Sequence, residues 1–402
     1  MDDKGLIQVV LGIHSPWFVK DINLNTSGKK MDIHLEFIKG SRFPCPVCNK
    51  LSEVHDTKER TWRHLDFFHY ESYLHARVPR TKCKEHGVKL VNLPWSRPNT
   101  GFTLFFEALI VTMSDVMPVS AVADMVSLNE ESVWRILAHY VNKAVENVDL
   151  SEVDTIGIDE ISVKKGHQYI TLFYDFNEKR VIHIEHGKGK DALKRFKKVM
   201  EDKIKPNQIK YISMDMSPAF ISGAKEYFPE AKIVFDKFHV IKMANDTIDK
   251  VRRKEQDKNK ALGKTKFIWL KNPENLSERE MKKLHSIKNL DTKTAKAYQF
   301  RIALQRLWSI KHPYIVREYF NKWYYWATHS NIDEIVKLAR TIDKHFIGIM
   351  EAIKRNLNNG VVEGMNNKIK TAFKRSYGFK NEKYRNTIIY LVAGKLDLPT
   401  QC

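Results

Sequence analysis

Three acidic side chains stand where the chain could bring them together for metal chemistry. Asp159 follows the apolar run TIGI and Asp215 follows YISM, so each lies at or near the end of an expected strand. Glu363 is the only acid between Glu351 and Glu382, a stretch that holds seven basic residues. Carboxylates on separate elements suit Mg²⁺ or Mn²⁺, which prefer oxygen ligands. Two such ions would activate a nucleophile and stabilise the leaving oxygen of a phosphodiester.

Glu363 is expected beside the apolar stripe of a helix that starts near Gly360, where it points into a polar site. Gly364 costs such a helix about 1 kcal/mol relative to alanine, which makes sense if another group approaches the backbone closely. Taken singly, each acid is more often a turn, cap or solvated residue. The basic residues of the same segment are expected to contact DNA: Lys368, Lys370, Lys374, Arg375 and Lys380.

A second set of residues has the spacing of zinc ligands. Cys45 and Cys48 form one pair with two residues between them, and Cys83 and His86 form another. Together they would close a tetrahedral Cys₃His site for structural Zn²⁺. The gap between the pairs exceeds the usual finger spacing, and a hairpin such as 62–80 could fill it. The alternative is three buried free thiols and a surface histidine.

Charge and composition narrow the class of partner. The 402 residues are 43% hydrophobic with a net charge of +20, which predicts two or three folded domains and a polyanionic partner, nucleic acid first. Residues 241–402 carry nearly all of the excess charge; the alternative is a basic but inert surface. No apolar run approaches the ~20 residues of a membrane span, and the acidic start does not fit a secretory signal. We therefore expect a cytoplasmic protein with no membrane partner.

The elements that must position these residues predict an α/β protein of several domains. Residues 155–235 read β-β-β-α-β-α-β, which implies a mixed sheet with helices on its faces. The expected parts are an N-terminal segment (1–40), a β-rich zinc-binding module (41–98), a helix-turn-helix (100–148), the first part of a catalytic core (153–244), an all-helical block (245–357) and a C-terminal helix that ends the core (358–396).

Three further features leave two interpretations each. The second helix of the helix-turn-helix carries Arg135 but starts with two glutamates, so it either contacts DNA or packs against a partner domain or subunit. Asp236 follows the fifth expected strand with His239 one turn later, and is either an accessory carboxylate near the metals or a helix cap. The aromatic group WYYW at 323–326 either stacks on a flipped base or lies in the core.

Several long blocks resemble the ISL-three family of bacterial insertion-sequence transposases. They include GIDEISVKKGHQYITLFYD, SMDMSPAFISGAKEYFPEAKIVFDKFHVIKMAN, NPENLSEREMKKL, TAKAYQFRIAL and NNGVVEGMNN, with PWSRPNTGFTLFFEAL and CKEHG in the N-terminal part. The resemblance runs from about residue 40 to about 395. It implies an RNase H-like domain with a helical insertion before the last acid. By motif, it places a DDE triad on Asp159, Asp215 and Glu363.

The expected function is that of a DNA transposase. A water would attack the phosphodiester at the element's end and free a 3′-hydroxyl, which then attacks target DNA. The partners would be the terminal inverted repeats and target DNA, held by a homo-oligomer as in similar transposases. The alternatives are a non-catalytic zinc and helix-turn-helix DNA-binding regulator, and an RNase H-like nuclease that cuts without joining.

Overall fold

The computed structural model describes residues 2–164, 168–205, 207–288, 292–355 and 360–399. The chain forms two compact units. The first combines Met1–Glu146 with Ala372–Ile388 and Leu396–Cys402, and the second combines Asn147–Thr371 with Ile389–Lys395. Two helices near the C-terminus, α14 (Gly360–Arg375) and α15 (Glu382–Ala393), therefore contribute to both units. No helix among the described residues is long and apolar enough to cross a membrane.

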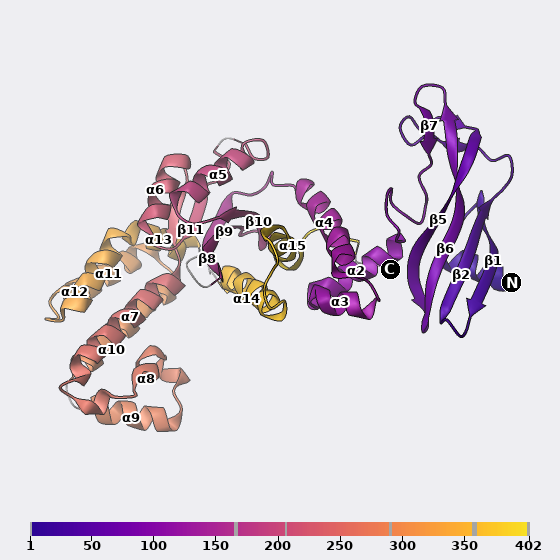
Figure 1. Ribbon diagram of the computed structural model, residues 1–402. Helices are drawn as coiled ribbons and strands as arrows, with labels where there is room; N and C mark the ends of the chain where they lie inside the picture. The colour runs from indigo at the N-terminus through magenta and orange to yellow at the C-terminus, as the bar shows by residue number, and fades with distance from the viewer. Residues whose placement is uncertain (1, 165–167, 206, 289–291, 356–359, 400–402) are drawn as a thin grey trace. The chain divides into compact units, whose positions relative to one another are not determined.

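The first unit is built on one five-stranded sheet that follows a short helix, α1 (Asp3–Val10) (Figure 1). Its path is β1-β2-β6-β5, with β7 paired to β6. The strands are β1 (Trp17–Asn25), β2 (Lys30–Phe37), β5 (Val54–Phe67), β6 (Tyr70–Cys83) and β7 (Gly87–Leu90). Because β2 pairs with β6 in parallel, the hairpin 17–37 shares a sheet with the cysteine-bearing segment. The expected boundary at residue 40 thus falls inside one sheet, whose apolar side chains form a common core.

Three helices follow this sheet: α2 (Leu104–Val116), α3 (Val119–Met125) and α4 (Glu130–Glu146). Thr103 caps α2 by accepting a hydrogen bond from the Phe106 N–H at 3.3 Å. The carboxylate of Glu107 is fully buried and accepts from Arg97, Thr100 and Tyr140. This shared acceptor fixes the preceding loop to α2 and α4, so the expected helix-turn-helix forms one packed module.

The second unit is centred on a five-stranded sheet with the order β10-β9-β8-β11-β12. Its strands are β8 (Thr155–Lys164), β9 (Gln168–Asp175), β10 (Arg180–His186), β11 (Tyr211–Met214) and β12 (Lys232–Phe235). The first three pair antiparallel, whereas β11 runs parallel to both β8 and β12. Helices α5 (Lys190–Met200) and α6 (Pro218–Tyr227) connect the later strands. The predicted order β-β-β-α-β-α-β and the mixed sheet are confirmed.

Helices cover both faces of this sheet. Phe173 of β9 stacks on Phe196 of α5 with ring centroids 3.9 Å apart. The next residue, Tyr174, instead donates a hydrogen bond to Asn366 of α14. Since successive strand residues point to opposite faces, α5 and α14 lie on opposite faces of the sheet. This arrangement matches the RNase H-like fold that the family resemblance implies.

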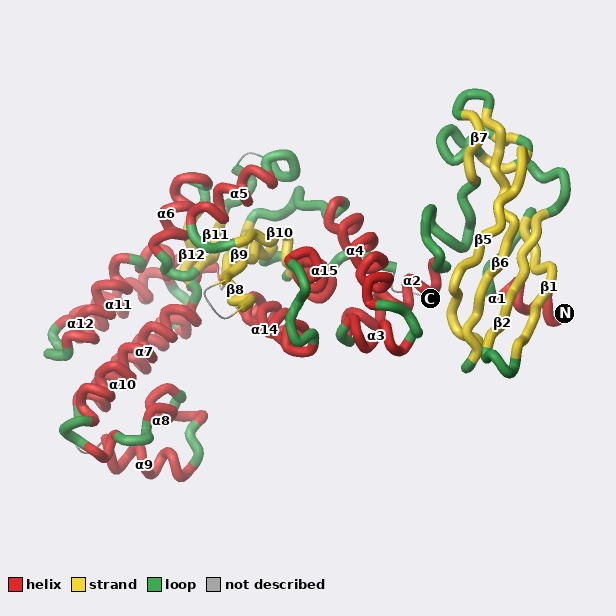
Figure 2. Tube along the Cα trace, viewed as in Figure 1, coloured by secondary structure: helices red, strands yellow, loops and turns green. Residues whose placement is uncertain are grey.

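An all-helical block separates β12 from α14 (Figure 2). It contains α7 (Lys237–Gln256), α8 (Lys266–Leu270), α9 (Glu278–Lys288), α10 (Lys293–Gln305), α11 (Pro313–Thr328), α12 (Asp333–Lys344) and α13 (Phe346–Arg355). Its apolar residues join those of the sheet in one continuous core. Within the WYYW group, Trp323 is buried and donates to the Phe300 carbonyl, while Tyr325 and Trp326 are exposed. The core interpretation therefore holds for only part of that group.

Candidate active site and zinc site

Three parallel strands bring aspartates together across the central sheet. Asp215 and Asp236 directly follow β11 and β12, whereas Asp159 lies in the middle of β8, so the expectation that it ends its strand is wrong. Ser213 of β11 is paired with Gly157 of β8, and Met214 with Phe235 of β12. Continuing both registers past the strand ends sets Asp215 opposite Asp159 on one side and opposite Asp236 on the other. Parallel pairing thus aligns three carboxylates across β8, β11 and β12, the edge where open α/β sheets bind ligands.

Asp159 is held by groups on both sides. One carboxylate oxygen accepts the backbone N–H of Glu160 at 2.8 Å. The other accepts the side-chain amide of Asn366 from α14, and the amide oxygen of Asn366 accepts the hydroxyl of Tyr174. Asn366 is buried, so this chain from β9 through α14 to β8 fixes the orientation of the carboxylate. Neither Asn366 nor Tyr174 was predicted as a site residue, although Asn366 lies one turn after Glu363.

Helix α14 approaches β8 closely at a glycine. A Cβ on Gly157 would lie 2.7 Å from Phe176 and 3.2 Å from Val362 of α14, so only glycine fits without displacing a neighbour. Glu363 follows Val362 and is exposed. Gly364 faces open space, because a Cβ there would meet no atom within 4 Å. The expected close approach to Gly364 is therefore not made by the described parts of the chain.

The three candidate acids do not form a compact metal-binding cluster. Among the described residues, Asp159, Asp215 and Glu363 do not form a group whose ligand atoms all lie within 4.8 Å of one another. Asp159 and Asp215 are nevertheless close enough for their charges to interact. Burial raises the pKa of Asp159, the Asp215 carboxylate raises it further, and hydrogen bonds from Glu160 and Asn366 oppose the rise. Burial also raises the pKa of Glu160, again with a contribution from Asp215.

Asp236 occupies the N-cap position of α7, yet its side chain makes no capping hydrogen bond. Its Oδ2 lies 3.4 Å from Nδ1 of His239. Both atoms are buried and have no well-formed hydrogen bond within the described ranges. Burial alone would lower the pKa of His239, but Asp236, Asp159 and Asp215 raise it overall. The pair therefore belongs electrostatically to the aspartate row rather than to helix capping.

Cys45, Cys48, Cys83 and His86 meet at one end of the first sheet. Their ligand atoms all lie within 4.8 Å of one another. The Cys48 and Cys83 sulfurs are 3.7 Å apart, and Nδ1 of His86 is 3.6 Å from Cys83 and 3.9 Å from Cys45. A zinc tetrahedron with Zn–S bonds of ~2.3 Å has edges of roughly 3.7 Å, so the spacing fits. Backbone N–H groups of Cys48 and Val47 lower the pKa of Cys45, which favours the thiolate that zinc binds.

Two short strands, β3 (Phe43–Pro44) and β4 (Leu51–Ser52), form the hairpin that presents Cys45 and Cys48. Cys83 ends β6, and the long β5–β6 hairpin spans the residues between the two ligand pairs. The gap that exceeds ordinary finger spacing is thus occupied by the body of the sheet.

The basic residues predicted to contact DNA differ in their surroundings. Lys368, Lys370, Lys374 and Lys380 are exposed on or after α14. Arg375 instead donates to the backbone carbonyl of Val116 in the helix-turn-helix module. Arg135 is exposed on α4, where it donates to Ser132.

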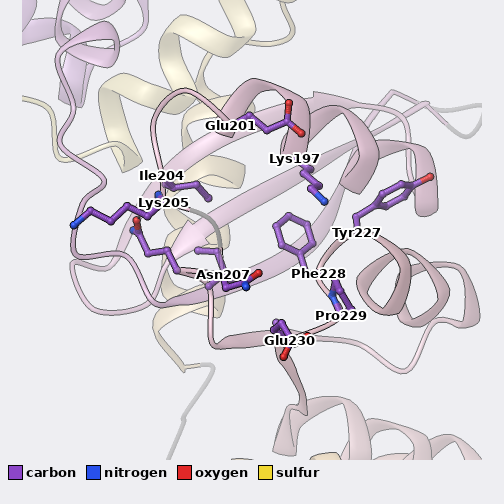
Figure 3. A pocket seen from close by; sticks show the side chains of 12 residues that line it. Lys197, Glu201, Ile204, Lys205, Asn207, Tyr227, Phe228, Pro229 and Glu230 are labelled. Atoms are coloured by element: carbon purple, nitrogen blue, oxygen red, sulfur yellow. Dashed lines mark hydrogen bonds between the residues drawn. The ribbon is translucent and has the colours of Figure 1, made fainter.

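A separate pocket of about 300 Å³ lies elsewhere in the second unit (Figure 3). Its lining comes from the end of α5 and from the loops that lead into β11 and β12, and includes Lys197, Tyr227 and Phe228. Those loops are at the amino ends of the parallel strands. The pocket is therefore at the opposite edge of the sheet from the aspartate row.

Three parts of the chain match transposase domains. Residues 156–389 match the transposase domain of family ISL3. Residues 91–141 match the helix-turn-helix domain of that family. Residues 41–86 match the zinc-finger of the transposases of IS204, IS1001, IS1096 and IS1165.

Curated relatives share most of the chain's length. The chain is 27% identical to the transposase for insertion sequence element IS1557 of Mycobacterium tuberculosis, over 95% of this chain and 93% of the relative. It is also 27% identical to the transposase for IS1001 of Bordetella parapertussis, over 85% and 86%. A solved structure, the Drosophila P element transposase strand transfer complex, is 10% identical with a TM-score of 0.42, over 75% of this chain and 94% of that one.

The domain match extends over more than half of the chain and includes the three aspartates of this row and α14. The two N-terminal matches fall on the zinc-ligand cluster and on α2 to α4. The chain belongs to the ISL3 family of insertion-sequence transposases, enzymes that cut and join DNA.

Proposed function

We propose that this transposase is of the DDE type and that Asp159, Asp215 and Glu363 are its catalytic acids. The observation that carries the proposal is the parallel register of β8 and β11, which aligns Asp159 with Asp215. Support for Glu363 comes from α14, which packs on Gly157 and hydrogen-bonds Asp159 through residues on either side of Glu363.

The residues present fit Mg²⁺ or Mn²⁺. The donors are carboxylate oxygens, which these ions prefer, and Oδ2 of Asp236 is a buried oxygen that lacks a well-formed hydrogen bond. Asp159, Asp215 and Glu363 would hold two ions, with Asp236 and His239 as accessory groups. Bound ions would supply activation of the attacking oxygen and stabilisation of the leaving oxygen.

The reaction proceeds in two displacements. In the first, water oxygen bonds to phosphorus at the element's end, the P–O3′ bond breaks, and the departing 3′ oxygen takes a proton. In the second, the oxygen of that 3′-hydroxyl loses its proton and bonds to a phosphorus of target DNA, the target P–O3′ bond breaks, and the displaced 3′ oxygen takes a proton. The protein's contribution is positioning: Asn366 fixes the Asp159 carboxylate, and the strand register fixes Asp215 beside it. Exposed lysines of α14 hold the DNA phosphates.

The proposal also includes a structural zinc ion, the DNA that is bound and the oligomeric state. Cys45, Cys48, Cys83 and His86 hold one structural Zn²⁺, since four ligands leave no open position for chemistry. The bound DNA comprises the element's terminal inverted repeats and the target. Two ends must be joined to one target, which favours a homo-oligomer on DNA.

Glu363→Gln tests the catalytic assignment. The fold should survive, because glutamine keeps the side-chain length and helix propensity. DNA binding should hold or tighten, because a carboxylate that repels phosphate is gone. Cleavage and joining of labelled end DNA with Mg²⁺ should fall at least about 100-fold. Glu351→Gln on α13 is the control and should react like the wild type.

The same assay separates the alternatives. Wild-type protein that cuts without joining would be a nuclease, and protein that binds without cutting would be a regulator. Wild-type cleavage by Glu363→Gln would remove Glu363 from the triad.

A further inference from the structure

One aromatic side chain between α14 and α15 projects fully into solvent. Tyr377 is 100% exposed, more than any other large hydrophobic residue among those the structure describes. It stands in the short loop that follows the helix of Glu363. A single exposed apolar ring is common on protein surfaces, so the case for a partner rests on how the loop holds this ring and on the charges around it.

The loop that carries Tyr377 is braced at both ends. The rings of Phe373 and Phe379 meet edge to face at 5.1 Å across its base. The Ser376 hydroxyl donates to the Ala372 carbonyl at 2.9 Å. Tyr377 has φ of +50°, a left-handed conformation that bulky residues rarely adopt, and it persists only where the surroundings enforce it. The ring is therefore presented by a fixed backbone.

The helix-turn-helix module contacts the residues on either side of this loop. Arg375 donates to the Val116 carbonyl at the end of α2. The ring of Tyr384 stacks on Trp134 of α4 at 4.1 Å with an interplanar angle of 1°, and its hydroxyl donates to Glu131 at 2.6 Å. The acidic first turn of α4 is thus used for packing against the C-terminal segment. The basic loop itself remains exposed to an anionic partner.

The charges around Tyr377 favour nucleic acid. Lys374, Lys380 and Lys383 are exposed on the loop and its flanking helices. Of the acids near this segment, Glu382 lies 3.9 Å from Arg385 and Glu131 accepts from Tyr384. Phe68, at the tip of the β5–β6 hairpin, is also exposed, but the residues that flank it include the acids Asp66 and Glu71 rather than lysines. An aromatic ring framed by lysines suits a base whose phosphates lie on either side.

We propose that the loop from Ser376 to Lys380 binds DNA ends, with Tyr377 stacked on an unpaired or terminal base and the flanking lysines on its phosphates. The inference rests on the proposed function, since cleavage at an element's end creates such bases. It adds a residue that recognises the state of the DNA end rather than its sequence, because every base presents a π-face.

The test uses the full-length protein without divalent metal, so that no strand is cut. The probe is a duplex with a short 3′ overhang whose first unpaired base is 2-aminopurine, compared with a blunt duplex. Wild-type protein should change the fluorescence of the overhang and bind it more tightly than blunt DNA. Tyr377→Asn removes the ring but tolerates the left-handed backbone. It should abolish the fluorescence change and lower overhang affinity by roughly 5- to 150-fold, with blunt-duplex affinity unchanged.

Two variants make the result decisive. Tyr377→Phe keeps the ring and should behave like the wild type. Tyr325→Ala removes a 67% exposed tyrosine on α11 and should also leave the signal unchanged. A wild-type signal in Tyr377→Asn, or its loss in Tyr325→Ala instead, would overturn this inference while leaving the transposase assignment intact. If wild-type protein bound neither the overhang duplex nor the blunt duplex, both this inference and the proposed function would be wrong.

Discussion

The interactions of single residues show why Asp159 needs Asn366. Partial burial of the Asp159 carboxylate beside Asp215 disfavours its charged form, as its raised pKa indicates. Asn366 offsets part of this by donating to the carboxylate, and its own amide oxygen is satisfied by Tyr174. Asparagine adds no charge, so a metal ion can still meet the full negative charge of the acids.

His64 predicts a pH dependence of the first unit. Its Nδ1 lies 2.8 Å from the hydroxyl of Thr103, whose proton a neutral imidazole can accept. Burial, with the charge of Arg63, lowers the pKa of His64 from 6.5 to about 4. The unfolded chain therefore binds the proton first. The contribution of neutral His64 to the free energy of unfolding is fully present above pH 6.5. It is lost as the pH drops toward 4, by up to roughly 3 kcal/mol.

Denaturant melts between pH 7 and pH 4 measure this effect. His64→Gln should flatten the loss of unfolding free energy, whereas His55→Gln, which removes an exposed histidine of the same strand, should not. Zinc release at low pH affects all three proteins alike. Identical slopes for wild type and His64→Gln would show that His64 contributes nothing to acid sensitivity.

At the scale of elements, the sequence predicted the order of strands and helices along the chain better than it predicted which of them contact one another. Apolar runs and turns predicted the second sheet, because each strand contains a short apolar, β-branched run, although β8 continues to Lys164, beyond the end expected near Asp159. The family motifs placed the candidate acids, but the network of Asn366 and Tyr174 joins residues 192 positions apart and leaves no local pattern. The parallel pairing of β2 with β6 was likewise hidden, since nothing in either strand specifies its neighbour.

The contact between α14 and β8 gives a prediction for Gly157→Ala. The new methyl group would overlap Phe176, which must move, and would press on Val362, which must give by a few tenths of an ångström together with α14. We expect a loss of about 1–3 kcal/mol in unfolding free energy and a fall in end-DNA cleavage. Adding Phe176→Leu should restore part of both, because Phe176 is the nearest obstacle. Chemical denaturation and a cleavage assay measure the two effects.

Gly364→Ala is the matched glycine control on α14. Its Cβ would meet open space, so the helix should gain up to about 1 kcal/mol. Cleavage lost without lost stability would mean that bound DNA approaches Gly364. Full stability and activity in Gly157→Ala would contradict the importance of the α14–β8 contact.

At the scale of the whole molecule, both compact units draw on the C-terminal segment. Residues 372–388 belong with the N-terminal sheet and helix-turn-helix, while the preceding part of α14 belongs with the second sheet. Sequence position alone does not reveal this division, because α14 is one continuous helix by its apolar spacing. The distribution of charge along the chain could be predicted, since it is counted directly from the sequence.

That charge distribution leads to a prediction about salt. A groove of about 520 Å³ between α7 and α12 is lined by Lys250, Arg253, Lys254 and Lys337. Arg253 and Lys254 contact Asp249 and Glu334, so we select Lys250 and Lys337 for neutralisation to glutamine. If both contact phosphates, the slope of log affinity against log salt should become shallower by about 1.8, or 0.9 for each.

The control, Lys4→Gln with Lys20→Gln, removes lysines that lie 3.5 and 3.6 Å from acids on the first sheet and should leave the slope unchanged. Titrations of a labelled duplex at several salt concentrations give both slopes, and equal changes in the two double variants would place the phosphate-binding surface outside this groove.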